Sequence, residues 1–386
     1  MQPDKLVHVF YKIVLAYACC MFLLVYFTVI SPRHHVGEST ILLHDRLSDR
    51  EDTPVNESAL HDGSIWLAGN DTGIPLYSDR VINPHLFNFT IANEDACFKN
   101  TENGQIFLVI LVKCRPNETY DRQQIMRTWG GVTEVLGRRT LTMFLIGQTD
   151  DPVIKQRIQI EDDTHHYFIQ EDFLDAYQNM TYKNIMGLRW VTLFCPQAEY
   201  VMSIDSDMVL NIVHLVRRLV KKSRVNFAEG HLRTDPLPHR HKSSKWYTPL
   251  KMYPEPTYAP FLNGACYVMS GDVAMAMYWK SGHVRFLQWD DVFIGLVMRK
   301  VGVEPQLSHQ YEQFAPVRSA LRHGIATGSG HNWNGVNEDT IAIWDAVVGK
   351  VLQNGDDTSI VLLYWIYFGC IVGVMVMLLS FYLYYS

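Results

Sequence analysis

The chain has 386 residues, which is enough for one large domain or two ordinary ones. Its composition, 48% hydrophobic and 19% charged, is typical of a globular protein that also carries membrane segments. The net charge of −6 gives no reason to expect nucleic acid as a partner. No internal repeat of 20–50 residues is visible, so a repeat architecture is not expected.

The first predicted element is a membrane-spanning helix at residues 13–30, "IVLAYACCMFLLVYFTVI". The stretch is uncharged and long enough to cross a bilayer, and no small-residue cleavage site follows it. We therefore expect a retained signal anchor, preceded by a cytoplasmic tail at residues 1–12. Five asparagine sequons follow the anchor, which favours a lumenal body; they begin at Asn56, Asn70, Asn88, Asn117 and Asn179.

Residues 31–100 are polar and lack hydrophobic periodicity, so we expect a lumenal stem there and a globular domain at residues 101–355. Within the domain, apolar runs that predict buried strands alternate with segments that predict helices. The strands are expected at 106–113, 141–147, 166–173 and 200–204, and the helices at 120–129, 153–161 and 181–194. This alternation predicts an α/β fold with a mostly parallel sheet flanked by helices.

A second membrane-spanning helix is predicted at residues 360–385, which are also uncharged and long enough to span. A lipid-anchor signal is the alternative, because Asn354, Gly355 and Asp356 are small or polar. Such a signal would need a spacer of roughly 8–12 residues, and the spacing here is shorter. We therefore expect a helix that returns the C-terminus to the cytosol.

The seven cysteines divide between membrane and lumen. Cys19, Cys20 and Cys370 fall in the predicted spans. The other four belong to the lumenal part, an oxidising compartment, where they allow three pairings among which the sequence does not choose; they are Cys97, Cys114, Cys195 and Cys266.

Two acids, Asp205 and Asp207 in "SIDSD", directly follow a predicted strand. Ligands of parallel sheets bind beyond the carboxyl ends of the strands. Two carboxylates at this spacing can hold a divalent cation against the phosphates of a substrate. The alternative is a turn that merely ends the strand.

Asp290 and Asp291 precede an apolar helical run. One acid could cap that helix, but two exceed what a cap requires, and a carboxylate here could act as a general base. Arg122 and Arg127 follow the first predicted strand, where a phosphate would dock. A solvated helix face is the alternative for this arginine pair.

Seven motifs together resemble the β-1,3-galactosyltransferase and β-1,3-N-acetylglucosaminyltransferase family, glycosyltransferase family 31, and most of all its brainiac-like branch. They occur in the order and at the spacings of that family, over residues 105–345. The motifs are "RQQIMRTWG", "FLIG", "EDFLDAYQNMTYKNIMGLRWV", "CPQAEYVMSIDSDMVLN", "SSKWYTPLKMYP", "GACYVMS" and "WDDVFIGL".

The resemblance implies a GT-A fold, a Golgi membrane enzyme with a lumenal catalytic domain, a UDP-sugar donor, and Mn²⁺ (or Mg²⁺). By the same resemblance, Asp205 and Asp207 match the outer acids of a metal-binding D-D-D motif, and Asp291 matches the catalytic base. The family also has a metal-binding histidine near the C-terminal end of the domain, which His331, or alternatively His323, would match. The segments that line the nucleotide, donor-sugar and acceptor sites are matched by Arg122, Arg127, Trp129, Lys245, Trp246 and Gly264.

Four features depart from the family pattern. Ser206 replaces the middle acid of the triplet, and Asp290 stands where many members have Glu. Leu262 stands where many members have Cys, so the usual disulfide pairing does not carry over to Cys266. The C-terminal apolar segment is not usual in the family.

We therefore expect an inverting transferase that forms a β-1,3 linkage on a glycolipid or glycoprotein acceptor. UDP-galactose or UDP-N-acetylglucosamine is the expected donor, with N-acetylgalactosamine a further option, and assembly as a homodimer or with another glycosyltransferase stays open. Ser206 and the C-terminal segment motivate a rival hypothesis, a catalytically silent partner or chaperone of another transferase. A glycosidase ranks last, because Asp205 and Asp207 lie at one strand end and do not flank a bond.

Overall fold

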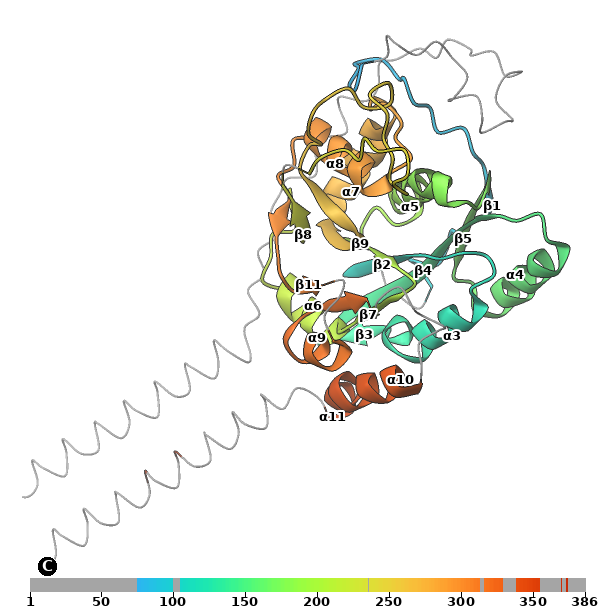
Figure 1. Cartoon of the computed structure of the whole chain (residues 1–386). Coiled ribbons are helices and arrows are strands. Elements are labelled where there is room, and N and C mark those ends of the chain that lie inside the picture. Colours follow the sequence, from blue (N-terminus) through green and yellow to red (C-terminus); the bar gives the residue numbers. More distant parts are fainter. Residues whose placement is uncertain are drawn as a thin grey trace, which may run out of the picture. The chain divides into compact units, whose positions relative to one another are not determined.

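The computed structural model describes residues 75–99, 105–234, 236–312, 316–328 and 338–354, with Gly369 and Gly373 (Figure 1). All of them belong to one compact unit, Asp71–Ser386. The predicted span 13–30 lies outside the described residues, as does 360–385 apart from the two glycines. In the described part of the chain, no helix is both long enough and apolar enough to cross a membrane.

Four parallel strands form the centre of the main sheet, in the order β5-β4-β2-β6. They are β2 (Leu108–Lys113), β4 (Arg138–Gln148), β5 (Phe168–Leu174) and β6 (Tyr200–Asp205). The helices that connect them are α3 (Thr119–Arg127), α4 (Pro152–His165) and α5 (Met180–Phe194). The predicted mixed α/β fold with a mostly parallel central sheet is confirmed.

Further strands extend the sheet at both edges. β1 (Phe89–Ile91) pairs with β5, while β9 (Phe261–Ser270), β8 (Ala228–Arg233) and β10 (Gln306–Leu307) continue from β6. The antiparallel pairs β1–β5, β6–β9 and β8–β9 make the sheet mixed as a whole, while β10 pairs parallel with β8. β3 (Glu134–Val135) pairs with β4. A separate three-stranded sheet contains β11 (Tyr311–Glu312), β12 (Ala326–Gly328) and β7 (Met208–Leu210).

Helices cover both faces of the main sheet, and each face has its own apolar core. The side chains of β2 alternate between the two cores, so that Val109 and Leu111 face one core while Leu108 and Ile110 face the other. The first core is covered by α5, α7 (Gly271–Ser281) and α8 (Asp290–Val301).

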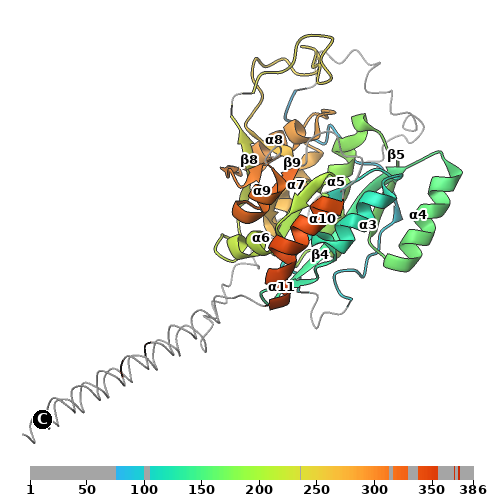
Figure 2. The same ribbon diagram turned by 60° about the horizontal axis from the view of Figure 1, so that its bottom comes forward.

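The second core is covered by α3, α4 and α6 (Ile212–Leu219). Figure 2, which brings this side forward, also shows α9 (Val317–His323), α10 (Glu338–Trp344) and α11 (Lys350–Asn354) there. The short helices η4 (Trp129–Gly131), η5 (Tyr177–Asn179) and η6 (Asp345–Gly349) complete the elements of the described residues. The apolar strands are buried on both faces, which explains why they read as continuous hydrophobic runs.

Local signals set the ends of several helices. Asp151 caps α4 by accepting hydrogen bonds from Val153 N (2.8 Å) and Ile154 N (3.2 Å), and Pro152 begins the helix. Gly302 ends α8 in the left-handed conformation with φ of 86°.

Residues 75–99, predicted as part of the stem, are packed on the folded unit. β1 adds to the sheet edge, and a disulfide joins Cys97 to Cys195 at the end of α5. Arg189 Nη1 in α5 donates to Phe87 O at 2.6 Å. The folded unit therefore begins before residue 101. Of the three open pairings the structure contains Cys97–Cys195, with Cys114 and Cys266 buried as free thiols.

Candidate active site

The site lies at the point in the sheet where the order of strand addition reverses. From β2 the chain adds β4 and β5 on one side, and then places β6 on the other side of β2. Lys113 and Asp205, the last residues of β2 and β6, are direct partners in the parallel register. The carboxyl ends of strands at such a switch point border a crevice that binds ligands in α/β proteins.

Lys113 is the centre of a group of polar contacts that we name the Lys113 cluster: Lys113, Asp205, Asp290 and the carbonyl of Gly264. Lys113 Nζ lies 2.9 Å from Asp205 Oδ1, 3.1 Å from Asp290 Oδ2 and 2.8 Å from Gly264 O. Its side chain is 1% exposed. Burial alone would lower the pKa of Lys113, but the two carboxylates raise it well above its ordinary value, so the side chain stays charged.

The N-terminus of α8 supplies the next two acids. Asp290 is held by Lys113 and also by Asn184 of α5, whose Nδ2 donates to Asp290 Oδ2 at 2.7 Å. Asn184 Oδ1 accepts in turn from Ser203 Oγ and Tyr267 OH, both at 3.3 Å. Strands β6 and β9 therefore fix the start of α8 through buried hydrogen bonds.

Asp291 is half-buried beside this cluster and fits the predicted base. Val292 N donates to Asp291 Oδ1 at 2.8 Å. Burial and the neighbouring charge of Asp290 raise the pKa of Asp291 to about 7. A carboxylate with a pKa near neutrality suits proton abstraction, because it is strongly basic yet still ionised at working pH. Gly264 permits close packing here, since a Cβ at that position would lie 3.2 Å from Asp291 Cβ.

Asp205, Ser206 and Asp207 follow in the turn between β6 and β7. Burial and the charges of Asp207 and Asp290 together raise the pKa of Asp205 to about 7, against the opposing effect of Lys113. Asp207 is exposed. Ser206 Oγ donates to Glu118 Oε2 at 2.9 Å, so the residue that replaces the middle acid binds a different acid from the β2–α3 loop.

The two outer acids suit a hard divalent cation. Asp205 Oδ1 is shielded from solvent and is paired with Lys113 Nζ at 2.9 Å. Carboxylate oxygens are ligands that Mn²⁺ and Mg²⁺ favour. Within the described residues, no group of three or more His, Cys, Asp or Glu side chains could hold a metal ion. His331 lies outside the described residues, and His323 is exposed at the end of α9.

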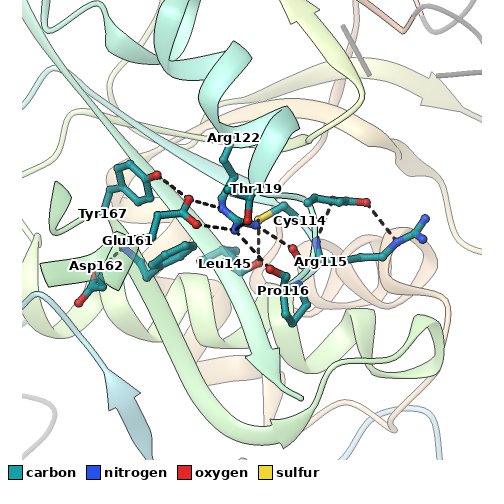
Figure 3. A network of polar contacts seen from close by, with 11 residues as sticks. Cys114, Arg115, Pro116, Thr119, Arg122, Leu145, Glu161, Asp162 and Tyr167 are labelled. Carbon is teal, nitrogen blue, oxygen red and sulfur yellow. Dashed lines mark hydrogen bonds and ion pairs between the residues drawn. The ribbon is translucent and has the colours of Figure 1, made fainter. Parts of the chain in front are cut away.

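Arg122 has a structural role in the described residues, whereas its predicted contact with the donor stays a prediction. Its side chain is fully buried and makes a two-pronged ion pair with Glu161, with Nε–Oε1 at 2.7 Å and Nη2–Oε2 at 2.8 Å (Figure 3). Nη1 donates to Arg115 O at 2.9 Å, and Nη2 donates to Pro116 O at 3.2 Å and Thr119 Oγ1 at 3.0 Å. Through these hydrogen bonds, Arg122 holds the β2–α3 loop in place.

The other two residues of that motif lie in different surroundings, and the predicted contact of Arg127 with the donor stays a prediction. Trp129 is 1% exposed and packs in the core on the α3 side of the sheet, which is a structural position rather than a pocket lining. Arg127 is exposed at the end of α3, with Nη1 3.5 Å from Gln124 Oε1. The regular spacing of residues on α3 did not reveal which face of the helix is buried.

Lys245 and Trp246 are exposed in the loop between β8 and β9. The ring of Tyr177, in η5, lies under Lys245 Nζ at 4.5 Å from the ring centroid. Lys113, Asn184 and Glu118 are site residues that sequence reasoning missed. Lys113 alone had a visible signal, because a lysine ends an otherwise apolar run in "IFLVILVK".

Comparisons with known proteins identify the family. The profile of the family described as Galactosyltransferase matches residues 120–309. The chain is 39% identical over 247 residues to beta-1,3-galactosyltransferase 1 of Mus musculus and of Homo sapiens, covering 63% of this chain and 74% of each relative. It is 39% identical over 211 residues to beta-1,3-galactosyltransferase 5 of Mus musculus, covering 54% and 68%.

Among solved structures, a glycosyltransferase involved in glycosylation of the major capsid of PBCV-1 has a TM-score of 0.37 and 10% identity, covering 62% of this chain and 99% of that one. The site and the sequence relatives define the protein as a glycosyltransferase. The chain belongs to the galactosyltransferase family, glycosyltransferase family 31.

Proposed function

We propose that the protein transfers galactose from UDP-galactose to the 3-hydroxyl of an acceptor glycan, forming a β-1,3 linkage with inversion. The names of the relatives favour galactose over N-acetylglucosamine and N-acetylgalactosamine. The observation that carries the proposal is the placement of Asp291 beside Asp205 and Lys113 at the switch point of the sheet.

Asp291 acts as the base. It takes the proton of the acceptor hydroxyl, whose oxygen forms a bond to the anomeric carbon of galactose while the bond from that carbon to the diphosphate breaks and UDP leaves. Asp205 and Asp207 would hold the Mn²⁺ or Mg²⁺. When bound, this cation neutralises the diphosphate and stabilises charge on the leaving UDP. Lys113 pairs with both Asp205 and Asp290, and so holds the start of α8 beside the end of β6.

The proposed setting is the Golgi membrane, with residues 13–30 and 360–385 as anchors and the acceptor carried by lipid or protein. Of the predicted sequons, Asn88 and Asn117 are exposed and Asn179 is half-buried, with Nδ2 donating to Leu174 O at 2.8 Å. Asn56 and Asn70 lie outside the described residues. Exposed sequons support a lumenal domain, since glycans need surface positions.

A donor and acceptor screen tests the function. The purified full-length chain is incubated with UDP-galactose, UDP-N-acetylglucosamine or UDP-N-acetylgalactosamine, a panel of acceptor glycosides, and MnCl₂ or EDTA. We expect Mn²⁺-dependent transfer of galactose, with a β-1,3 linkage in the NMR spectrum of the product. If the wild type transfers no sugar from any of these donors to any acceptor, the proposal is contradicted. That result would favour the rival hypothesis of a silent partner.

A further inference from the structure

Two exposed aromatic side chains, Tyr177 and Trp246, share one lysine although they are far apart in the chain. Each is 48% exposed. Lys245 Nζ lies 4.5 Å from the centroid of the Tyr177 ring and 5.7 Å from that of the Trp246 ring. The other exposed aromatic side chains of the described residues are Phe98, Tyr120 and Trp279. A cation between two aromatic faces joins η5 to the β8–β9 loop.

This aromatic pair is connected to the start of α8, which carries the base. Trp289 immediately precedes Asp290, and its ring centroid lies 6.4 Å from that of Tyr177. Trp289 is buried, and its Nε1 donates to Thr248 Oγ1 at 2.8 Å. Thr248 belongs to the same loop as Trp246, so Trp289 contacts Tyr177 on one side and the loop that carries Trp246 on the other.

Further hydrogen bonds hold the pair in place. Thr181 Oγ1, at the start of α5 just after Tyr177, donates to Leu287 O at 2.6 Å. Thr248 Oγ1 and Tyr258 OH are 2.7 Å apart. Both supporting segments are therefore fixed to buried groups, which makes the exposed rings a preformed surface.

The chemistry of this surface suits a sugar ring. A pyranose has an apolar face of C–H groups that packs on an aromatic ring, and a rim of hydroxyls that accept hydrogen bonds from an ammonium group. The donor diphosphate requires cationic partners near Asp205 and Asp207, whereas the aromatic pair adjoins α8 through Trp289, two residues before Asp291. The hydroxyl that loses its proton to Asp291 belongs to the acceptor.

We propose that Tyr177, Lys245 and Trp246 form an acceptor platform, on which the sugar ring that receives galactose stacks. The proposal rests on the proposed function, because it names the acceptor side of the same site. Tyr177 would then be a substrate-contacting residue alongside Trp246. The occupant is a neutral or N-acetylated hexose ring within the acceptor glycan.

Saturation-transfer NMR tests the platform without requiring turnover. The probes are methyl β-galactoside, methyl N-acetyl-β-glucosaminide and methyl N-acetyl-α-galactosaminide, added to the full-length chain with UDP and MnCl₂ in a detergent that has no sugar headgroup. We expect at least one glycoside to receive saturation at its ring C–H protons. Tyr177→Ala and Trp246→Ala should each weaken its binding about tenfold, since each removes an aromatic face.

Three matched variants define the controls. Trp279→Ala removes another exposed tryptophan, 58% exposed on α7, and should leave binding unchanged. Tyr177→Phe keeps the ring and should bind like the wild type. Lys245→Met keeps the length of the side chain but removes its N–H donors, so we expect a smaller loss than for Trp246→Ala.

The outcomes separate this proposal from the proposed function. Unchanged glycoside binding in Tyr177→Ala and Trp246→Ala, or no saturation of any glycoside by the wild type, would overturn the platform. If these variants instead convert a dimer to a monomer in sedimentation, the rings belong to an interface between copies, and the platform is again overturned. Intact glycoside binding without galactose transfer would contradict the proposed function alone.

Discussion

Two clusters of buried ion pairs lie close to the end of β2, and they differ in the ratio of acidic to basic side chains. Arg122 is paired with a single carboxylate, Glu161, and its remaining N–H groups bind loop carbonyls and a hydroxyl. Tyr167 OH also donates to Glu161 Oε1 at 2.7 Å. Lys113 instead faces two carboxylates, Asp205 and Asp290, with further acids nearby.

The pKa values of the acids show the consequence. Burial would raise the pKa of Glu161, but the hydrogen bonds from Arg122 and Tyr167 lower it, so its ionised form stabilises the fold at neutral pH and loses that effect in acid. The pKa of Asp205 is raised from 3.8 to about 7, so stability is lost as pH rises between these values and the full cost of ionisation is present above pH 7. A satisfied cluster holds the structure together, whereas a cluster with excess acid favours binding of a cation.

The largest expected effect comes from Asp291→Asn, which removes the base and keeps the shape. Galactose transfer should fall about 10³-fold, because general-base catalysis is worth that much. Mn²⁺-dependent UDP binding, measured by calorimetry, should stay at the wild-type level. Asp272→Asn, at the first turn of α7, is the control and should retain activity. Full activity of Asp291→Asn would remove the residue from the mechanism.

Arg122→Leu should act on stability instead of catalysis. It leaves Glu161 buried and unpaired, so the free energy of unfolding in urea should fall by about 3 kcal/mol. The double variant Arg122→Leu/Glu161→Leu should recover much of this loss, because the unpaired charge is gone. UDP affinity of the folded fraction should not change. A loss of UDP binding without destabilisation would show that Arg122 contacts the donor after all.

The pH dependence of the reaction follows from Asp291. Its pKa is raised to about 7, and only the ionised form accepts a proton, so kcat/KM should fall about tenfold per pH unit below neutrality. The stability of the fold, followed by urea unfolding at each pH, separates this loss from acid unfolding. A rate that stays constant from pH 8 down to pH 5.5 would be incompatible with this base.

The smallest expected effect concerns Ser206. Ser206→Ala removes the hydrogen bond to Glu118 and should cost about 0.5–1 kcal/mol of stability. Ser206→Asp restores the acid that the family pattern contains, but it faces Glu118, so it should be at least as destabilising. Glu118→Gln in the same chain should relieve that repulsion. Equal stability of Ser206→Asp with and without Glu118→Gln would show that the two side chains do not interact.

Strong local patterns made much of the fold predictable. The continuous apolar runs of β2, β4 and β6 predict strands that are buried on both faces. The pairs Asp205/Asp207 and Asp290/Asp291 are visible in the sequence because they lie directly at the ends of such elements. Other features depend on tertiary contacts that no local pattern contains. The side on which Arg122 is buried, the partner of Cys97 and the packing of residues 75–99 all involve residues distant in the chain.

The most direct test of the central claim is a calorimetric titration of Mn²⁺ into the full-length chain with UDP present. The acid-rich Lys113 cluster with Asp207 is the proposed cation site, and the Arg122 cluster is structural. We therefore expect Mn²⁺-dependent UDP binding in the wild type and in Glu161→Gln, and its loss in Asp207→Ala. Equal binding in Asp207→Ala, or loss of binding in folded Glu161→Gln, would contradict the account.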